Sequence, residues 1–160
     1  MKIGILLSNV EYNQLVHYVS EFCNRNHLID LIGFYENTPQ LNNRVNFALM
    51  QVSEIYSYKG VGIATNISTA EKLINSPSPI DKYLYVWDLE WLRFPNKNYH
   101  DFARIYRNPE LKIITRNKDY ADLLEYSFNI KVKYIADNFK IEKILCPKKK
   151  NYSRQPAETN

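Results

Sequence analysis

The stretch K-Y-L-Y-V-W-D-L-E-W-L-R, residues 82–93, changes from an apolar run into a cluster of acids and indoles. Residues 83–86 are aromatic or aliphatic without polar alternation, which is typical of a central parallel strand covered by helices on both faces. The second half contains the polar and aromatic residues Trp87, Asp88, Glu90, Trp91 and Arg93. Ligands of open α/β sheets bind outside the carboxyl ends of the strands. Asp88 is therefore the first candidate for a working residue.

A purely structural interpretation of the same residues stays open. Asp88 could cap the segment that follows, and Arg93 could pair with a nearby carboxylate. The two tryptophans could simply fill the edge of the sheet.

Strand and helix patterns alternate on both sides of this stretch. Strands are expected at residues 3–7, 28–35, 45–51, 60–65, 83–86, 111–115 and 132–136, and helices at residues 12–23, 68–74 and 99–106 and after Asn117. Residues 52–59 stay ambiguous, and residues 38–44 and the segment around Pro95 are predicted loops. The alternation predicts an α/β fold, a single Rossmann-like domain of three layers with a mostly parallel sheet of about seven strands.

Several helix starts carry specific signals. Ser68-Thr-Ala-Glu71 has the pattern of a capping box. Asn9, Asn66 and Asn117 are placed to cap helices. The buried side of the helix after Asn117 is expected to comprise Tyr120, Leu123, Leu124 and Phe128.

The residues that follow the strands predict one polar rim at the carboxyl edge of the sheet. Its members are Ser8 and Asn9, Thr65 and Asn66, Asp88 and Glu90, Thr115 and Arg116, and Asp137 and Asn138. The candidates for contact with a substrate are Ser8, Asn9, Thr65, Asn66, Glu90, Thr115 and Arg116 of this rim, together with Trp87, Trp91 and Arg93. Each polar residue of the rim also has an alternative interpretation as a helix cap.

Length and charge indicate one domain with a basic end. A chain of 160 residues can bury a core without disulfides or metals, and we expect a packed domain at residues 1–139 and a flexible tail at residues 140–160. The tail has six basic and two acidic residues, whereas the preceding part has fifteen of each. A neutral body is not typical of a nucleic-acid binder, although the tail could contact phosphates without sequence preference. The alternative is a solvated, disordered end.

Other functional classes lack their signals. The first turn, Ser8-Asn9-Val10-Glu11, has no glycine, and neither a G-x-G-x-x-G nor a G-x-x-x-x-G-K-[ST] motif occurs. No G-x-S-x-G elbow is present, and the three histidines form no cluster with cysteines, so no metal or cofactor is expected. Cys23 and Cys146 make no disulfide framework. The amino terminus is too short for a signal peptide and no segment could span a membrane, which indicates a cytoplasmic protein.

Three stretches carry a resemblance to a known family. They are M-K-I-G-I-L at residues 1–6, G-V-G-I-A-T-N-I-S-T-A-E-K-L at residues 60–73, and the opening stretch at residues 82–93. With L-K-I-I-T-R-N (111–117) and V-K-Y-I-A-D-N-F (132–139), the pattern resembles the amino-terminal half of two-domain GT-B glycosyltransferases, particularly those of tailed bacteriophages. The likeness covers residues 1 to about 140.

This resemblance implies a role for Asp88. In phage DNA glucosyltransferases an aspartate after a tyrosine-rich central strand is the general base, and Asp88 resembles it in position. It would take the proton of an acceptor hydroxyl as that hydroxyl attacks a nucleotide-activated sugar. Trp87 and Trp91 could stack on a sugar or base, and Arg93 or Arg116 could contact a phosphate or carboxylate of the acceptor.

The sequence departs from the family in one respect. GT-B enzymes hold the nucleotide-sugar mainly with a carboxyl-terminal domain, and residues 140–160 are too few for one. We therefore expect either a half-enzyme completed by a second polypeptide or by a homodimer, or a non-catalytic phage module that binds a host protein or DNA. A small stand-alone binder is the remaining alternative.

Overall fold

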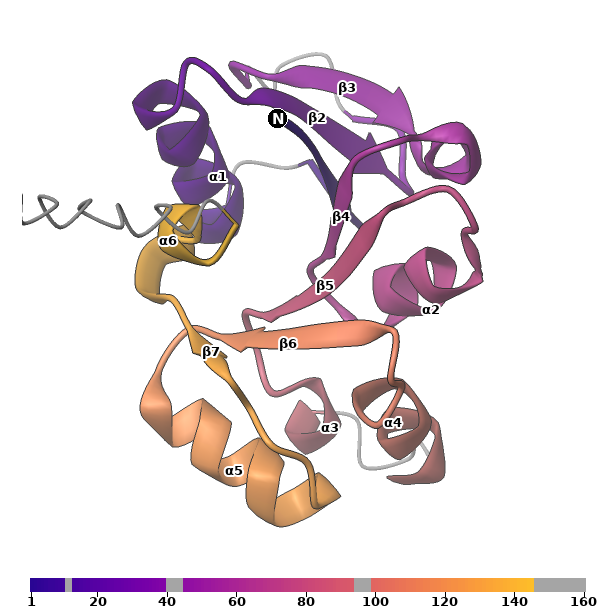
Figure 1. Ribbon diagram of the computed structural model, residues 1–160, viewed down its shortest axis with the longest axis vertical. Helices are drawn as coiled ribbons and strands as arrows, with labels where there is room; N and C mark the ends of the chain where they lie inside the picture. Colours follow the sequence, from indigo (N-terminus) through magenta and orange to yellow (C-terminus); the bar gives the residue numbers. More distant parts are fainter. Residues whose placement is uncertain (11–12, 40–44, 94–98, 146–160) are drawn as a thin grey trace, which may run out of the picture.

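Parallel strands form a single sheet across the described part of the chain, which comprises residues 1–10, 13–39, 45–93 and 99–145 of the computed structural model. The sheet has seven strands in the order β3-β2-β1-β4-β5-β6-β7 (Figure 1). The strands are β1 (Lys2–Leu7), β2 (Asp30–Tyr35), β3 (Ala48–Gln51), β4 (Val61–Ala64), β5 (Asp81–Val86), β6 (Leu111–Thr115) and β7 (Tyr134–Ile135). Expected loops at residues 40–44 and 94–98, and residues 146–160 of the expected tail, lie outside the described residues.

The strand order creates a switch point beside β1. The chain moves from β1 to β2 and β3 on one side, then returns to place β4 on the other side of β1. In register, Ile5 lies opposite Gly33 of β2 and Ile63 of β4. At such a switch point the loops after the two strands diverge and leave a crevice at the carboxyl edge. The predicted α/β, Rossmann-like class is thus confirmed.

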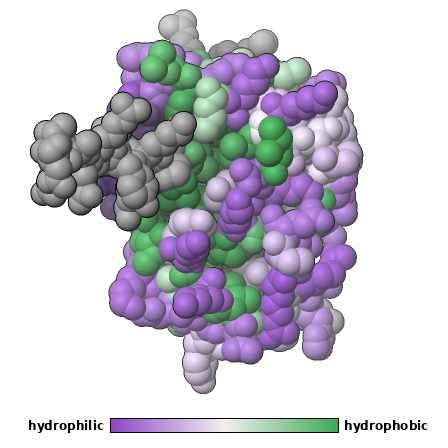
Figure 2. All heavy atoms as spheres, viewed as in Figure 1, coloured by the Kyte–Doolittle hydropathy of each residue, from purple (hydrophilic) through white to green (hydrophobic). Residues whose placement is uncertain are grey.

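Helices cover both faces of the sheet. They are α1 (Gln14–Arg25), α2 (Ile67–Asn75), α3 (Glu90–Arg93), α4 (Tyr99–Tyr106), α5 (Lys118–Phe128) and α6 (Glu142–Leu145), with 3₁₀ turns η1 (Val52–Ser57) and η2 (Asp137–Phe139). Helices α1 and α6 lie on the face opposite α2 and α4 (Figure 1). Hydrophilic residues dominate the periphery of the face in Figure 2, as expected for amphipathic helices.

Alternation along each strand divides the core into two clusters. Ile3, Ile5 and Leu7 of β1 pack against α1, where Val19 and Phe22 are fully buried. Leu6 and Ala64 point to the other face and join the cluster that contains residues of α2, α4 and α5. This division explains why the strands read as continuous apolar runs, because both faces of the sheet are buried.

Some expected boundaries are wrong. Strand β2 begins at Asp30, and Leu28, the expected first residue, lies in a turn and is 94% exposed. Strand β3 is shorter than the expected residues 45–51. Strand β7 covers only Tyr134–Ile135, and the ambiguous residues 52–59 contain η1. Leu123 is exposed, so the buried residues of α5 are Ala121, Leu124 and Phe128.

The capping assignments are confirmed in part. Asn117 caps α5, accepting from the Tyr120 amide at 2.8 Å. The capping box of α2 is formed by Asn66 and Thr69 rather than by Ser68 and Glu71. Asn13, not Asn9, caps α1.

The packed body continues past residue 139. Ile141 is fully buried, and Ile144 and Leu145 of α6 pack against the cluster on the α1 face. The Glu142 carboxylate accepts hydrogen bonds from Arg25 Nη2 at 3.2 Å and from Asn26 Nδ2 at 3.1 Å. Residues 141–145 therefore belong to the domain, which moves its expected boundary past residue 139.

Candidate functional site

A crevice of about 270 Å³ opens at the carboxyl edge of the sheet, beside the switch point. We call it the rim crevice. It is lined by Leu7, Ser8, Asn9, Asn13, Leu15, Thr65, Asn66, Trp87, Asp88 and Glu90. The structure thus brings together residues from the ends of β1, β4 and β5, as the topology predicts. The volume lies just below the roughly 300–1,000 Å³ of pockets for drug-sized ligands, which suits a ligand smaller than a dinucleotide.

At the β1–β4 junction, the polar side chains are bound to one another. Thr65 is buried, and its hydroxyl donates to the Leu6 carbonyl oxygen at 2.7 Å. The side-chain oxygen of Asn66, Oδ1, accepts from the Thr69 backbone amide at 2.8 Å, and its side-chain nitrogen, Nδ2, donates to the Ser8 hydroxyl. These bonds fasten the ends of two neighbouring strands. They leave little hydrogen-bonding capacity for a ligand.

Glu36, which sequence reasoning missed, extends this network. Its carboxylate accepts from the Ser68 hydroxyl at 2.9 Å and pairs with the Lys72 ammonium at 2.7 Å. Burial raises the pKa of Glu36, but hydrogen bonds from Lys72, Ser8 and Ser68 and the charge of Lys72 outweigh it, so the pKa is lowered. A signal was available in the sequence, because Glu36 directly follows β2 as the other rim residues follow their strands.

Glu90 lies against the amino terminus of α2. Its Oε1 accepts from the Ile67 amide at 2.9 Å. The amino end of a helix attracts anions because its first amides are unpaired and its dipole is positive there. The protein's own carboxylate thus takes the place that a ligand phosphate would prefer at this helix.

The Asp88 carboxylate lines the crevice and has hydrogen-bond acceptor sites that its protein contacts do not use. Its Oδ1 accepts from the Leu89 amide at 3.0 Å, and its Oδ2 pairs with Arg93 Nη1 at 2.8 Å. Both contacts agree with the structural interpretation. An ionised carboxylate has about four acceptor sites, and the side chain is 29% exposed. It can therefore still accept a proton or a hydrogen bond from a ligand hydroxyl.

Beside Asp88, an aromatic and cationic pair extends the rim toward β6. The Arg116 guanidinium lies 4.2 Å from the centroid of the Trp87 ring, and 5.9 Å from that of Tyr120. Trp87 also contacts the rings of Tyr85 and Tyr18. In the described part of the chain no acid pairs with Arg116, and no acceptor binds the Trp87 indole N–H. A guanidinium held flat on an indole presents its fork of donors to a carboxylate or phosphate.

Four of the predicted substrate-contact residues do not line the crevice, and one of them is Arg116, which lies over the Trp87 ring. The others are Trp91, Thr115 and Arg93. Trp91 packs edge-on against Phe128 and Tyr106, with ring centroids 5.0 and 5.7 Å apart, on the face opposite α1. Thr115 is fully buried, and its hydroxyl donates to the Asn117 carbonyl oxygen at 3.0 Å. Arg93 reaches the site only through its ion pair with Asp88.

The end of β7 has a structural task. The Tyr85 hydroxyl donates to the Ala136 carbonyl oxygen at 2.8 Å and accepts from the Phe139 amide at 3.1 Å. These bonds hold the turn in which Asn138 and Phe139 have positive φ angles of 49° and 57°. Asp137 and Asn138 therefore lie in the turn that leads to α6.

Among the described residues, no group of three or more His, Cys, Asp or Glu side chains could hold a metal ion. Nor does any helix in the described ranges have the length and apolar character to cross a membrane. No protein-family model matches the sequence, and no curated protein or solved structure matches the chain. The functional argument therefore depends on the geometry of the rim.

Proposed function

We propose that the chain is the acceptor-binding domain of a sugar transferase, with the acceptor held in the rim crevice. The observation that supports this proposal is the position of Asp88. Its carboxylate lines the crevice next to the Trp87–Arg116 pair and keeps acceptor capacity. A carboxylate, an aromatic face and an unpaired guanidinium suit a hydroxylated ligand with an anionic group.

In the proposed reaction Asp88 is the general base. It takes the proton of an acceptor hydroxyl while the hydroxyl oxygen forms a bond to the anomeric carbon of the donor sugar. The bond between that carbon and the nucleoside diphosphate breaks, and the diphosphate leaves with the electron pair. Trp87 would stack on the acceptor, and Arg116 would bind its phosphate or carboxylate. Asn9 and Asn13 also line the crevice and can contact acceptor hydroxyls.

The donor would come from a second protein surface. The loop after β1 carries Ser8 and Asn9 rather than glycines, and Glu90 occupies the amino terminus of α2. These features disfavour a diphosphate in the rim crevice itself. A partner polypeptide or a second copy of the chain would then bring the nucleotide-sugar to Asp88.

The second candidate is a non-catalytic module that binds a host protein or DNA. It is favoured by the contacts of Asp88 with the Leu89 amide and with Arg93, which suffice to explain an aspartate at this position. Nucleic-acid contacts are expected of the basic tail at residues 140–160, and four of its six basic residues, Lys148, Lys149, Lys150 and Arg154, lie outside the described residues. In this alternative the Asp88 carboxylate takes part in no chemical reaction.

Calorimetric titration and a donor-cleavage assay distinguish the candidates. The chain is titrated with UDP-glucose and GDP-mannose at high protein concentration, and release of the nucleoside diphosphate is followed over time. The transferase proposal predicts release that falls at least about 100-fold in Asp88→Asn, with donor binding retained. Asp122→Asn is the matched control, since Asp122 is also ion-paired but lies on α5. Nucleoside-diphosphate release that is unchanged in Asp88→Asn would contradict the proposal. Absence of donor binding would exclude a donor site completed by a homodimer and leave only the half-enzyme form, in which a second polypeptide holds the nucleotide-sugar.

A further inference from the structure

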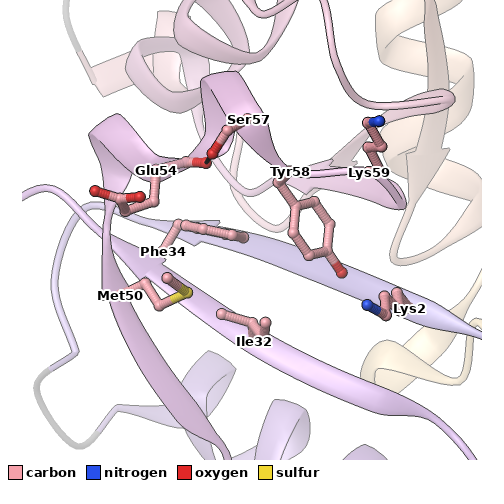
Figure 3. Close-up of a pocket in the computed structure, with 8 residues that line it drawn as sticks. All are labelled: Lys2, Ile32, Phe34, Met50, Glu54, Ser57, Tyr58 and Lys59. Atoms are coloured by element: carbon pink, nitrogen blue, oxygen red, sulfur yellow. Dashed lines mark hydrogen bonds between the residues drawn. The ribbon is translucent and has the colours of Figure 1, made fainter.

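A second hollow lies between η1 and the strands β1, β2 and β3, away from the rim crevice (Figure 3). Its volume is about 330 Å³. We call it the η1 hollow. Ile32, Phe34 and Met50 supply an apolar wall, so the hollow can accommodate the hydrocarbon part of a small molecule.

One polar group in the wall of this hollow is buried without a partner. Tyr58 is 9% exposed, and its hydroxyl oxygen has no hydrogen bond within the described part of the chain. Its ring packs edge-on against Phe34, at 5.1 Å between centroids, and over Gly4, where a Cβ would lie 2.9 Å from Tyr58 Cε1. The ring is therefore fixed. Buried hydroxyls nearly always have partners, so this hydroxyl is a donor at the wall of the hollow that a ligand oxygen can satisfy.

At neutral pH the hydroxyl is a donor. Burial, and then the charge of Asp30, raise the pKa of Tyr58 to about 12. The hydroxyl therefore keeps its proton and can donate a hydrogen bond to an acceptor oxygen.

The charges around the hollow are unevenly placed. Lys2, Lys59 and Glu54 line the hollow, and none of them has an ion pair with another described residue. Figure 3 shows the Tyr58 hydroxyl pointing toward Lys2, while Glu54 lies at the far end beyond Phe34 and Met50. The Tyr58 end thus offers a hydroxyl donor and the Lys2 ammonium, against the single negative charge of Asp30, which lies beside Lys2 in the sheet and acts on the Tyr58 hydroxyl. At the other end, Glu54 repels a second anion.

We propose that the η1 hollow binds a small monocarboxylate with an apolar body. The carboxylate accepts from the Tyr58 hydroxyl and pairs with the Lys2 ammonium, and the apolar body lies against Ile32, Phe34 and Met50. The exposed Lys2 side chain moves aside to admit the ligand, because the hydroxyl is closed to water in the unliganded protein. This site is independent of the sugar-transfer proposal, since none of its residues lines the rim crevice.

An NMR titration of the full chain tests the site. Backbone amide spectra are recorded with phenylacetate, with the neutral phenylacetamide and with ethylbenzene as probes. The proposal predicts saturable shifts of the Ile32, Lys59 and Gly60 amides with phenylacetate, and binding about tenfold weaker for the amide. Equal binding of phenylacetamide would overturn the assignment of a carboxylate. Shifts confined to the rim crevice would overturn the site.

Two variants identify the groups that bind. Tyr58→Phe keeps the ring and should weaken phenylacetate binding about tenfold, and Lys2→Gln should weaken it several-fold. Tyr126→Phe and Lys131→Gln are matched controls, because both residues are exposed and lie far from the hollow. The dispersion of the amide spectrum verifies that each variant is folded. Unchanged binding in folded Tyr58→Phe would overturn the proposal.

Discussion

The rim contains two neighbouring regions whose side-chain donors are used differently. At the β1–β4 junction, Ser8, Thr65 and Asn66 bind the backbone or one another. At the β5–β6 junction, the Arg116 guanidinium lies over the Trp87 ring, and the side-chain N–H donors of both residues have no acceptor among the described residues. The first region holds the strands together, whereas the second presents chemical groups to the crevice.

This difference shows that topology and chemistry need not coincide. The switch point between β1 and β4 creates the crevice, as the strand order requires. The groups available to a ligand, however, come from the ends of β5 and β6 next to it. Substitutions at the first junction should therefore change mainly stability, and those at the second mainly binding.

The largest effect on stability is expected from Asn66→Ala. The change removes the cap of α2 and the bond to Ser8, which should lower the free energy of unfolding by about 2 kcal/mol. Urea unfolding followed by circular dichroism measures it. Asn108→Ala is a control, because its side chain caps only a local turn at Glu110. An equal loss in both variants would mean that the β1–β4 junction has no special structural role.

The sequence predicts the fold well because the fold depends on repeated local patterns. Apolar strands alternating with amphipathic helices suffice to predict the parallel sheet and the convergence of Ser8, Thr65 and Asp88 at one edge. The pattern does not reveal which polar groups bind each other. Trp87 and Trp91 look alike in sequence, yet Trp87 follows a strand and faces the rim, whereas Trp91 lies in α3 and packs on Phe128.

Other features escape prediction for physical reasons. The segment at residues 141–145 is short, follows Lys140 and contains Lys143, so nothing local indicates that Ile141 is fully buried on the α1 face. Their burial depends on the turn at Asn138 and Phe139, which the distant Tyr85 hydroxyl holds. Such contacts join residues far apart in the sequence, and periodicity carries no information about them.

The second effect concerns acid sensitivity at the β1–β4 junction. The folded-state pKa of Glu36 is lowered, so its carboxylate stabilises the fold above its unfolded pKa, and this contribution is lost as the pH falls through the folded value. Glu36→Gln should be less stable than wild type at pH 7 by about 1 kcal/mol, because the partly exposed pair with Lys72 is lost. Thermal unfolding between pH 7 and pH 3 measures the difference. A stability difference between wild type and Glu36→Gln that persists at acid pH would contradict the stabilising role of the ionised Glu36 carboxylate.

A smaller effect on stability is expected from Arg116→Met, at the β5–β6 junction. Loss of the cation over Trp87 should cost about 0.5 kcal/mol or less, because methionine keeps part of the apolar contact. Binding of glucose 1-phosphate should nevertheless weaken about tenfold, since a charge-assisted contact is lost. Calorimetry with Arg104→Met as control gives both values, since Arg104 pairs with Glu71 away from the rim. A large loss of stability in Arg116→Met, with unchanged binding of glucose 1-phosphate, would mean that the β5–β6 junction has a structural role and not a binding role.

The smallest effect on stability is expected from Asp88→Asn. The asparagine oxygen can still accept from the Leu89 amide, and only an exposed ion pair with Arg93 is lost. The free energy of unfolding should change by about 0.5 kcal/mol or less, as urea unfolding would show. A loss near 2 kcal/mol would mean that Asp88 is chiefly a structural cap.

The most direct test of the central claim uses the indole N–H signals of the two tryptophans. Glucose 1-phosphate and UDP-glucose are titrated into ¹⁵N-labelled protein, and the signals are assigned with Trp87→Phe and Trp91→Phe. The account predicts a saturable shift of the Trp87 signal at the rim. The signal of Trp91, which is partly buried against Phe128 and does not line the crevice, is the internal control and should not shift. A Trp87 signal that no probe moves, or one that moves no more than that of Trp91, would contradict a ligand site at the β5–β6 junction.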